Sequence, residues 1–400
     1  MAFGTIEQAL DDLRAGKFVV VADDEDRENE GDLICAAEKI TPDMVNFMMR
    51  AKGMICLALT NEIADRMDLP LMGREHSDAF RTAYTITIDG APHHGVTTGI
   101  SAADQATTIR VAVDSRSTPN DLRRPGHVHP LRARSGGVLQ RTGHTEAAVD
   151  LARAAGLTPA GVICEILNDD GSTAKRPQLE VYAREHGLTF ITVAQLVAWR
   201  LRTERLVRRV ADAKLPTDFG EFRIVGYEND VDRAEHVALV YGEIGDGEDV
   251  LVRMHSKCLT GDTFHSLRCD CRWQLHEAMR RVAERGRGVI VYLDQEGRGI
   301  GLLNKLRAYG LQDAGKDTVE ANEALGFQAD LRNFGIGAQV LLDLGVRSIR
   351  VMTNNPKKVV GVEGYGLRIS GTERIQAPET AENADYLRTK REKLGHLKAL

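Results

Sequence analysis

Three cysteines lie close together in the run HSKCLTGDTFHSLRCDC, at Cys258, Cys269 and Cys271. Alternate side chains of an extended segment share a face, so Cys269 and Cys271 can direct both sulfurs at one point. The turn at residues 259–262 can return Cys258 to that point. Three thiolates with one open position are typical of a catalytic zinc, which makes hydroxide available near neutral pH, whereas a structural zinc has four protein ligands. Three buried, reduced thiols are the alternative.

An acidic turn, DDEDRENEGD at residues 23–32, follows the first expected strand. Carboxylates this close repel one another unless water or a divalent cation neutralises them. A loop that leaves a buried strand is also where α/β proteins place their chemistry. The turn is therefore a candidate cation site, with a solvated, highly charged loop as the alternative.

The run RTGHTE at residues 141–146 ends in a predicted helix N-terminus. Free amides and the helix dipole at such a point favour a phosphate group. Arg141 and Thr145 would add donors, and His144 is available as a metal ligand. The alternative for His144 is a helix cap or a core residue.

Length and composition indicate a two-domain globular protein. The chain has 400 residues, which suggests two domains of roughly 200 residues each. The formal net charge of −6 gives no general attraction to nucleic acid. Because neither a signal peptide nor an apolar run of about 20 residues is found, we expect a cytoplasmic protein without membrane contact. Six cysteines, three of them in one motif, favour metal chemistry over disulfides.

The first half alternates predicted helices and strands. Helices are expected from Thr5 to about Gly16, from Thr41-Pro42 to Gly53, and over residues 144–155. Strands are expected over residues 17–22 and 160–166. The pattern is that of a mixed α/β domain.

One long basic helix is expected over residues 192–214, until Pro216 interrupts it, with the domain boundary near Arg208. A solvated connector is favoured over an RNA-binding stripe. In the second half, strands are expected over residues 236–244, 250–254, 288–293 and 347–353, and a helix over 274–285. We therefore expect two layered α/β/α domains, each with a mixed sheet and its own site, joined by this connector.

Long motifs in both halves resemble known families. ADDEDRENEGDLICAAEKIT, TTGISAADQATTIR, RPGHVHPLRA and GGVLQRTGHTEAAVDLARAAGLTPAGVICEI resemble 3,4-dihydroxy-2-butanone 4-phosphate synthase, assigned to residues 1–202. LVRMHSKCLTGDTFHSLRCDC, DQEGRGIGLLNKLRAYGLQD, DLRNFGIGAQ and TNNPKK resemble GTP cyclohydrolase II, assigned to residues 208–400. Together the chain resembles the bifunctional protein that starts riboflavin synthesis.

For the first half, the resemblance implies conversion of ribulose 5-phosphate to 3,4-dihydroxy-2-butanone 4-phosphate and formate. Enolising a ketose needs a base beside a Lewis acid, here magnesium or manganese held by Glu28 and His144. The resemblance places further active-site residues at Arg27, Asp32, Cys56, His127 and Glu165, with Thr108, Arg141 and Thr145 near the phosphate.

For the second half, the resemblance implies opening of the imidazole ring of GTP, with release of formate and pyrophosphate. The three cysteines match the zinc ligands, and Tyr309 the residue that assists ring opening. Asp330 matches the acid/base and Arg332 a proposed nucleophile, although a protonated arginine is better suited to stabilising phosphate charge. A magnesium ion is expected on the pyrophosphate, and the residues expected to hold GTP are Arg253, Glu296, Arg298, Thr353 and Lys358.

Several positions depart from the family patterns. Lys257 replaces the usual glutamate before the first cysteine, where it could lower the basicity of the thiolate, disturb nucleotide binding or point to solvent. Asp294 stands where a basic or neutral residue is usual. The other departures are Arg272 and Gln105, and Phe80-Arg81 in place of an aromatic residue or histidine followed by glycine.

These departures leave two hypotheses open. The leading one is a bifunctional enzyme, which is expected to be a homodimer because both families resemble dimers with sites near subunit contacts. The other is a paralogue that has lost one or both reactions and acts as a binding or regulatory subunit. Incomplete processing of GTP is disfavoured by Tyr309, whose replacement usually accompanies it.

Overall fold

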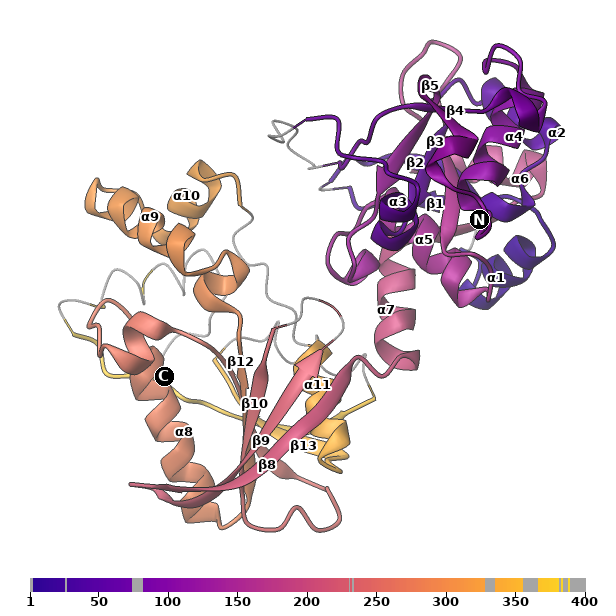
Figure 1. Cartoon of the computed structure of the whole chain (residues 1–400). Coiled ribbons are helices and arrows are strands. Elements are labelled where there is room, and N and C mark those ends of the chain that lie inside the picture. The colour runs from indigo at the N-terminus through magenta and orange to yellow at the C-terminus, as the bar shows by residue number, and fades with distance from the viewer. Residues whose placement is uncertain are drawn as a thin grey trace. The chain divides into compact units, whose positions relative to one another are not determined.

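The computed structural model describes residues 3–25, 27–73, 82–229, 231, 234–327, 335–354, 366–380, 383 and 388. It divides into two compact units, Met1–Arg200 and Leu201–Leu400. Each unit is a mixed α/β domain built on its own seven-stranded sheet (Figure 1). Among the described residues, every helix is too short or too polar to span a lipid bilayer.

The first sheet has the strand order β4-β5-β3-β6-β2-β1-β7. Its described pairs are antiparallel except for β3 with β5 and β1 with β7. Its strands are β1 (Val19–Ala22), β2 (Gly31–Ala36), β3 (Cys56–Leu59), β4 (Ile88–Gly90), β5 (Leu122–Arg132), β6 (Ala160–Glu165) and β7 (Thr189–Thr192).

Helices cover both faces of this sheet, because its strands are apolar on both sides. One face packs against α2 (Pro42–Arg50), α3 (Asn61–Arg66), α4 (Ala102–Val113) and α6 (Arg176–His186). The other packs against α1 (Ile6–Arg14), α5 (His144–Ala154) and α7 (Val193–Thr203). Short 3-10 turns are η1 (Ala37–Lys39), η2 (Pro92–His94), η3 (Pro119–Asp121) and η4 (Gly137–Leu139).

The second sheet has the order β14-β13-β11-β12-β10-β9-β8. The strands from β12 through β11 and β13 to β14 run parallel, whereas β8, β9, β10 and β12 pair antiparallel in turn. Its strands are β8 (Val207–Thr217), β9 (Gly220–Asn229), β10 (His236–Tyr241), β11 (Val250–Ser256), β12 (Gly288–Leu293), β13 (Ser348–Met352) and β14 (Arg368–Glu373).

In the described part of this unit, α8 (Cys271–Arg285) lies on one face of the second sheet and α11 (Gly335–Asp343) on the other (Figure 1). The other described elements are a π-helical turn (Leu259–Thr263), the 3-10 turn η6 (Glu296–Gly299), α9 (Leu302–Asp313) and α10 (Thr318–Ala324). The π-helical turn, η6 and α9 contribute residues to the cysteine cluster described below.

Most expected elements are present. Thr5 and Gln8 form the expected capping box, Thr41 caps α2, and the strand expected over residues 288–293 is β12. The strand expected over residues 236–244 ends at Tyr241, because Gly242 turns the chain with a φ of 67°.

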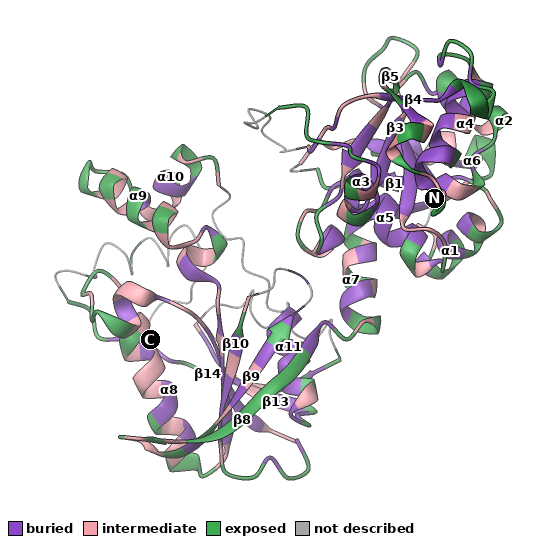
Figure 2. Ribbon diagram, in the orientation of Figure 1, coloured by how far each residue is buried: buried purple, intermediate pink, exposed green. Residues whose placement is uncertain are grey.

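The prediction of one long basic connector helix is wrong beyond Thr203, where α7 ends. Residues Val207–Thr217 instead form the edge strand β8, which Figure 2 shows as mostly exposed. Pairing with β9 overrides helix propensity here, and ion pairs such as Arg223 with Asp212 (2.7 Å) bridge the two strands. Pro216 is tolerated because an edge strand can lack one amide donor.

The expectation of a solvated helix is also wrong for Arg200 of α7. Arg200 is buried and donates to Asp150 at 2.7 Å, whose carboxylate also accepts from Val138 N at 2.7 Å. The helix therefore packs its apolar side and this ion pair onto the first sheet, instead of serving as a freely solvated basic connector.

Candidate active sites

The second site lies at one edge of the second sheet. Because β11, β12 and β13 run parallel, their carboxyl ends meet there. Cys258 follows β11, Glu296 follows β12 and Thr353 follows β13. Residues from three separate parts of the sequence are thereby brought to the position where parallel sheets place ligands.

The three sulfurs converge as the motif predicts. The sulfur atoms of Cys258, Cys269 and Cys271 all lie within 4.8 Å of one another, and those of Cys258 and Cys269 are 3.8 Å apart. The π-helical turn returns the chain over Cys258, and Gly261 N donates to Cys258 Sγ at 3.3 Å. A Cβ at Gly261 would lie 2.8 Å from Cys269 Sγ, so only glycine fits between the sulfurs.

The prediction that Cys269 and Cys271 converge because they lie on an extended segment is wrong. The segment is not extended: Asp270 has φ −96° and ψ 7°, and Cys271 is the first residue of α8. The carboxylate of Asp270 accepts from Gln274 Nε2 at 2.7 Å, which fixes this bend. The N-terminus of a 15-residue helix also stabilises thiolate charge beside it.

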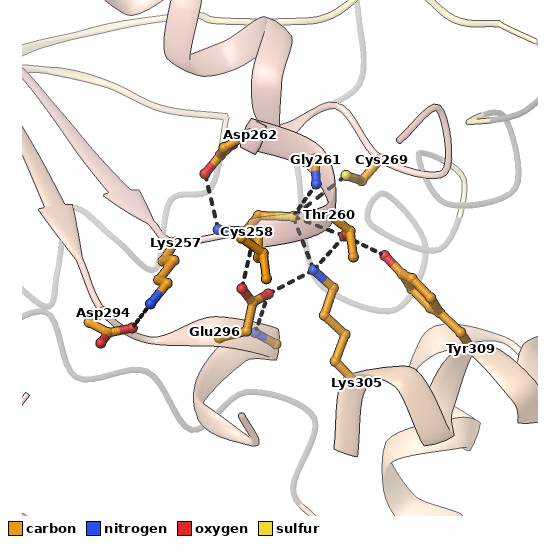
Figure 3. Close-up of polar contacts among 12 residues, drawn as sticks. Lys257, Cys258, Thr260, Gly261, Asp262, Cys269, Asp294, Glu296, Lys305 and Tyr309 are labelled. Atoms are coloured by element: carbon orange, nitrogen blue, oxygen red, sulfur yellow. Dashed lines mark hydrogen bonds and ion pairs between the residues drawn. The ribbon is translucent and has the colours of Figure 1, made fainter. Parts of the chain in front are cut away.

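Lys305 supplies the positive charge of the cluster. Its Nζ lies 3.1 Å from Cys258 Sγ, 2.9 Å from Thr260 Oγ1 and 2.7 Å from Glu296 Oε1 (Figure 3). Contact with the thiols of Cys269 and Cys271, and then the nearby ammonium of Lys305, lower the pKa of Cys258, although burial opposes this. The cluster therefore favours a thiolate at Cys258 even without a metal. Three sulfur ligands of this kind suit a thiophilic cation such as zinc.

Tyr309 lies one helical turn after Lys305 on α9. Its hydroxyl is 3.1 Å from Thr260 Oγ1, and burial raises the pKa of the phenol. Asp262 supports the other side of the turn, because it accepts from Cys258 N at 3.0 Å and from Tyr292 OH at 2.9 Å.

The residues expected to hold GTP differ in how far they are already engaged. Glu296 accepts from Leu259 N at 2.7 Å, from Lys305 and from its neighbour Gly297 N, so most of its roughly four acceptor sites are occupied. Arg253 is buried and donates to Gln274 and to Met352 O.

Of the other residues expected to hold GTP, Arg298 and Thr353 are described by the structure and Lys358 is not. Arg298 has a left-handed φ of 63° in η6, and Thr353 is buried, its amide bound to Glu373 O at 2.9 Å. The positions Asp330, Arg332, Lys358 and Phe80-Arg81 lie outside the described residues.

Two departures from the family pattern contact each other. Lys257 Nζ lies 3.0 Å from Asp294 Oδ1, with both side chains a little over one-third exposed (Figure 3). Backbone pairing places them together, because Lys257 N donates to Leu293 O at 2.8 Å. The lysine therefore reaches toward the loop after β12, where it meets a carboxylate, while a different lysine contacts the Cys258 sulfur.

The first site lies where β1 ends and β2 begins. Ligand atoms of Asp23, Glu28 and His144 lie within 4.8 Å of one another. His144 Nε2 is 3.1 Å from Val21 O, and since a carbonyl only accepts, Nε2 carries the proton there. The other ring nitrogen, Nδ1, then faces Glu28 Oε2 at 3.8 Å and Asp32 Oδ1 at 3.6 Å.

The charges at this site fit a divalent cation. Asp32 is buried, and its Oδ1 has no hydrogen-bond partner within the described residues. Burial raises the pKa of Asp32 to about 7. Burial opposes protonation of His144, yet the carboxylates of Asp32 and Glu28 raise its pKa to about 9. A position that attracts a proton this strongly also attracts a cation to the same lone pairs.

Strand register brings most of the remaining predicted residues to the same end of the sheet. Asp32 pairs with Glu165 across β2 and β6, and Cys56 pairs with His129 across β3 and β5, two residues from His127. Glu165 Oε2 accepts from Met54 N at 2.7 Å, and His127 Nδ1 is 2.8 Å from Asp89 Oδ2.

Thr108 differs from these residues. It lies on α4, which packs against the face opposite α5. Its hydroxyl accepts from Gly90 N at 2.8 Å, so it serves the local packing of β4 in this chain.

Two arginines lie at the start of α5. A Cβ at Gly143 would be 2.3 Å from Arg141 Nη1 and 3.0 Å from Arg27 Nη2, so both guanidinium groups approach this glycine. Gly143 provides no side-chain cap for the helix, and Thr145 is buried within its first turn. The amides at this N-terminus, with two cations beside them, suit an anionic group.

Sequence reasoning missed Lys305, Asp23 and Glu146. Lys305 lies four residues before Tyr309, and this spacing on a helix was a usable signal. Asp23 was in the acidic turn but was not distinguished from its neighbours. Glu146, which pairs with Arg141 at 2.5 Å, stands in the RTGHTE run, but nothing in the sequence shows this pairing.

Two family models match separate parts of the chain. The 3,4-dihydroxy-2-butanone 4-phosphate synthase family matches residues 7–199, and the GTP cyclohydrolase II family matches residues 208–376. Riboflavin biosynthesis protein RibBA of Salinispora tropica is 60% identical over 399 residues, and that of Bacillus subtilis is 55% identical over 397, each match covering 99% of both chains.

A solved structure is also similar. The structure of RibBX from A. baumannii, described as a two-domain 3,4-dihydroxy-2-butanone 4-phosphate synthase, is 34% identical with a TM-score of 0.73. The match covers 94% of this chain and all of that one.

Gly261→Ala tests the geometry of the sulfur cluster. The added Cβ would press on the sulfurs of Cys269 and Cys258, so we expect bound metal per chain, measured by elemental analysis, to fall at least several-fold. The matched control is Gly310→Ala in α9, where a Cβ meets nothing within 4 Å and metal content is expected to stay unchanged. Equal metal content in the two variants would contradict this geometry.

Proposed function

Since the chain belongs to the RibBA family of bifunctional riboflavin biosynthesis enzymes, we propose which of its residues carry each of its two reactions. The chain is a 3,4-dihydroxy-2-butanone 4-phosphate synthase, which is a lyase, and a GTP cyclohydrolase II. These activities imply ribulose 5-phosphate and GTP as substrates. We assign the first reaction to residues 1–202 and the second to residues 208–400.

The first reaction is proposed to occur around Glu28 and His144, which hold magnesium or manganese with help from Asp23. Such a cation supplies a Lewis acid that stabilises an enediolate. Asp32 Oδ1, which accepts no hydrogen bond within the described residues and lies 3.6 Å from His144 Nδ1, can accept the proton lost from the ketose, and Glu165 lies beside Asp32 on β6. Because burial strongly raises the pKa of Cys56, this residue acts as a thiol and not as a thiolate nucleophile.

The phosphate of the first substrate is proposed to bind at the start of α5. The amides of the first turn and the guanidinium groups of Arg27 and Arg141 would oppose its charge, with Thr145 as a further donor. His127, oriented by Asp89, remains a proposed contact to substrate. The proposal that Thr108 lies near this phosphate rests only on the family resemblance.

The second reaction is proposed to occur at the cysteine cluster, with Cys258, Cys269 and Cys271 holding zinc. Zinc with one open position supplies an activated water. Together with the other two thiols, Lys305 favours the thiolate of Cys258, and it also holds Glu296 against the cysteine turn. Since burial raises the pKa of Tyr309, the phenol keeps its proton at neutral pH and can donate it as the imidazole ring opens.

The remaining assignments for GTP rest on the family resemblance. Arg253, Arg298, Thr353 and Lys358 are proposed to hold the nucleotide, with magnesium on the pyrophosphate. Asp330 is proposed as an acid/base and Arg332 as a stabiliser of phosphate charge. Glu296 has few acceptor sites left for the guanine edge, so its first role is to position the cysteine turn.

We also propose a homodimer in the cytoplasm. The dimer is implied by the resemblance, and a reducing compartment is required to keep the three cysteines available to a metal. A binding subunit that has lost one reaction is the second candidate, because the two-domain relative RibBX is described by the first activity alone. The contact of Lys257 with Asp294 argues against it, since it pairs two of the departures from the family pattern with each other.

Reciprocal ligand variants test the two assignments in the full chain. Cys269→Ser is expected to lose GTP turnover by more than about 100-fold, since even partners outside the ligand shell are worth about 10–100-fold, while formate release from ribulose 5-phosphate persists. His144→Gln is expected to give the reverse result. If either variant lost both reactions, the two sites would not be independent.

Exchange of charges tests the contact of Lys257 with Asp294. Lys257→Asp and Asp294→Lys alone each place like charges together, and we expect each to lower kcat/KM for GTP by about two- to fivefold, the effect of a partly exposed pair. The double exchange is expected to restore the wild-type value to within about twofold. Additive losses in the double variant would show that the two residues act separately.

A further inference from the structure

A cluster of two histidines and one aspartate lies outside both active sites. His93 and His94 belong to the 3-10 turn η2 after β4, and Asp121 ends the 3-10 turn η3 just before β5. The three candidate ligand atoms lie within 4.8 Å of one another. The two turns adjoin β4 and β5, which pair at the outer edge of the first sheet (Figure 1).

Both imidazoles point to the same oxygen. His93 Nε2 is 2.9 Å and His94 Nε2 is 2.8 Å from Asp121 Oδ1. Neighbouring side chains in a turn usually diverge, whereas these two rings lie with their centroids 4.2 Å apart. Two nitrogens and one oxygen thus converge on one point.

The carboxylate is held in this orientation by its own turn. Its other oxygen, Oδ2, accepts from Thr118 N at 2.8 Å and from Thr118 Oγ1 at 2.9 Å. Ala91 N also donates to Asp121 O at 2.8 Å, which ties η2 to η3 through the backbone. Asp121 Oδ1 is therefore presented to the imidazoles by a fixed group, and not by a mobile surface side chain.

The histidines are held by a short, rigid turn. Pro92 occupies an initial position of η2, and Gly95 ends the turn with a left-handed φ of 82°. The side chains of His93 and His94 are 60% and 30% exposed, so a cation can reach them and water can complete its coordination.

We propose that His93, His94 and Asp121 form a binding site for one divalent transition-metal cation of the zinc, cobalt or nickel class. Two imidazole nitrogens and one carboxylate oxygen suit such borderline cations and not magnesium, which prefers oxygen ligands alone. The neutral rings need only carry their protons on Nδ1, so that both Nε2 lone pairs and Oδ1 face the cation. The donor set differs from the three sulfurs of one active site and from the carboxylate-rich set of the other.

The site would fasten two turns. Asp121 stands directly before β5, which is irregular next to it, because the adjacent residues Asp89 and Ile88 pair with Arg123 and Val128 and His127 lies in the intervening bulge. Residue Asp89 of β4 in turn orients His127. A cation joining η2 to η3 would therefore stabilise the edge of the sheet that carries this pair.

Zinc stoichiometry of the full chain tests the proposal. Protein dialysed against buffer with zinc and excess magnesium is analysed for bound zinc, and wild type is compared with a His93→Gln, His94→Gln double variant. Glutamine can still donate to Asp121, so the turns are expected to fold and ribulose 5-phosphate turnover to stay unchanged. The variant is expected to bind one zinc fewer per chain.

Two further variants complete the test. His186→Gln, at another exposed histidine of the same domain, is expected to bind as much zinc as wild type. Asp121→Asn removes the charge and is expected to weaken binding of the same zinc at least tenfold. Equal zinc content in wild type and the double histidine variant would overturn the proposal and leave a hydrogen-bonded surface cluster, as would an equal loss of zinc in His186→Gln.

Discussion

Three sulfur atoms brought to one point are the constraint on which the second half of this protein depends. Thiolates at such short separations repel, so the arrangement needs positive charge and close backbone approach. Lys305 supplies the charge, Gly261 permits the approach, and the N-terminus of α8 adds its dipole. Parallel pairing of β11 with β12 brings Cys258 and Glu296 to the same edge, where Lys305 bridges them.

The first half also gathers groups of like charge at one point, with carboxylates in place of sulfur atoms. Asp23, Glu28 and Asp32 converge near one imidazole, and a carbonyl at the end of β1 holds the proton of His144 on Nε2. Arg27 balances part of this negative charge, since its guanidinium group pairs with Asp23 at 2.8 Å and with Glu28 at 2.6 Å. Oxygen-rich ligands in one domain and sulfur ligands in the other would sort magnesium and zinc by donor type, without any need for contact between the two sites.

The sequence predicted elements and ligands better than it predicted contacts. Buried strands such as β12 follow from their apolar runs, and the cysteines from their spacing. The helix expected through Lys214 failed because pairing of β8 with β9 outweighs local propensity. The bend at Asp270 depends on the start of α8, and the contact of Lys257 with Asp294 exists only because two distant segments become adjacent strands. Neither can be seen in local patterns.

Zinc K-edge X-ray absorption of the full chain shows which atoms bind the zinc, and the His93→Gln, His94→Gln background removes a second class of zinc ligand. We expect three sulfur neighbours at about 2.3 Å and one lighter atom whose signal changes when GTP is added. Four protein ligands that GTP leaves unchanged, or fewer than three sulfurs, would contradict this expectation.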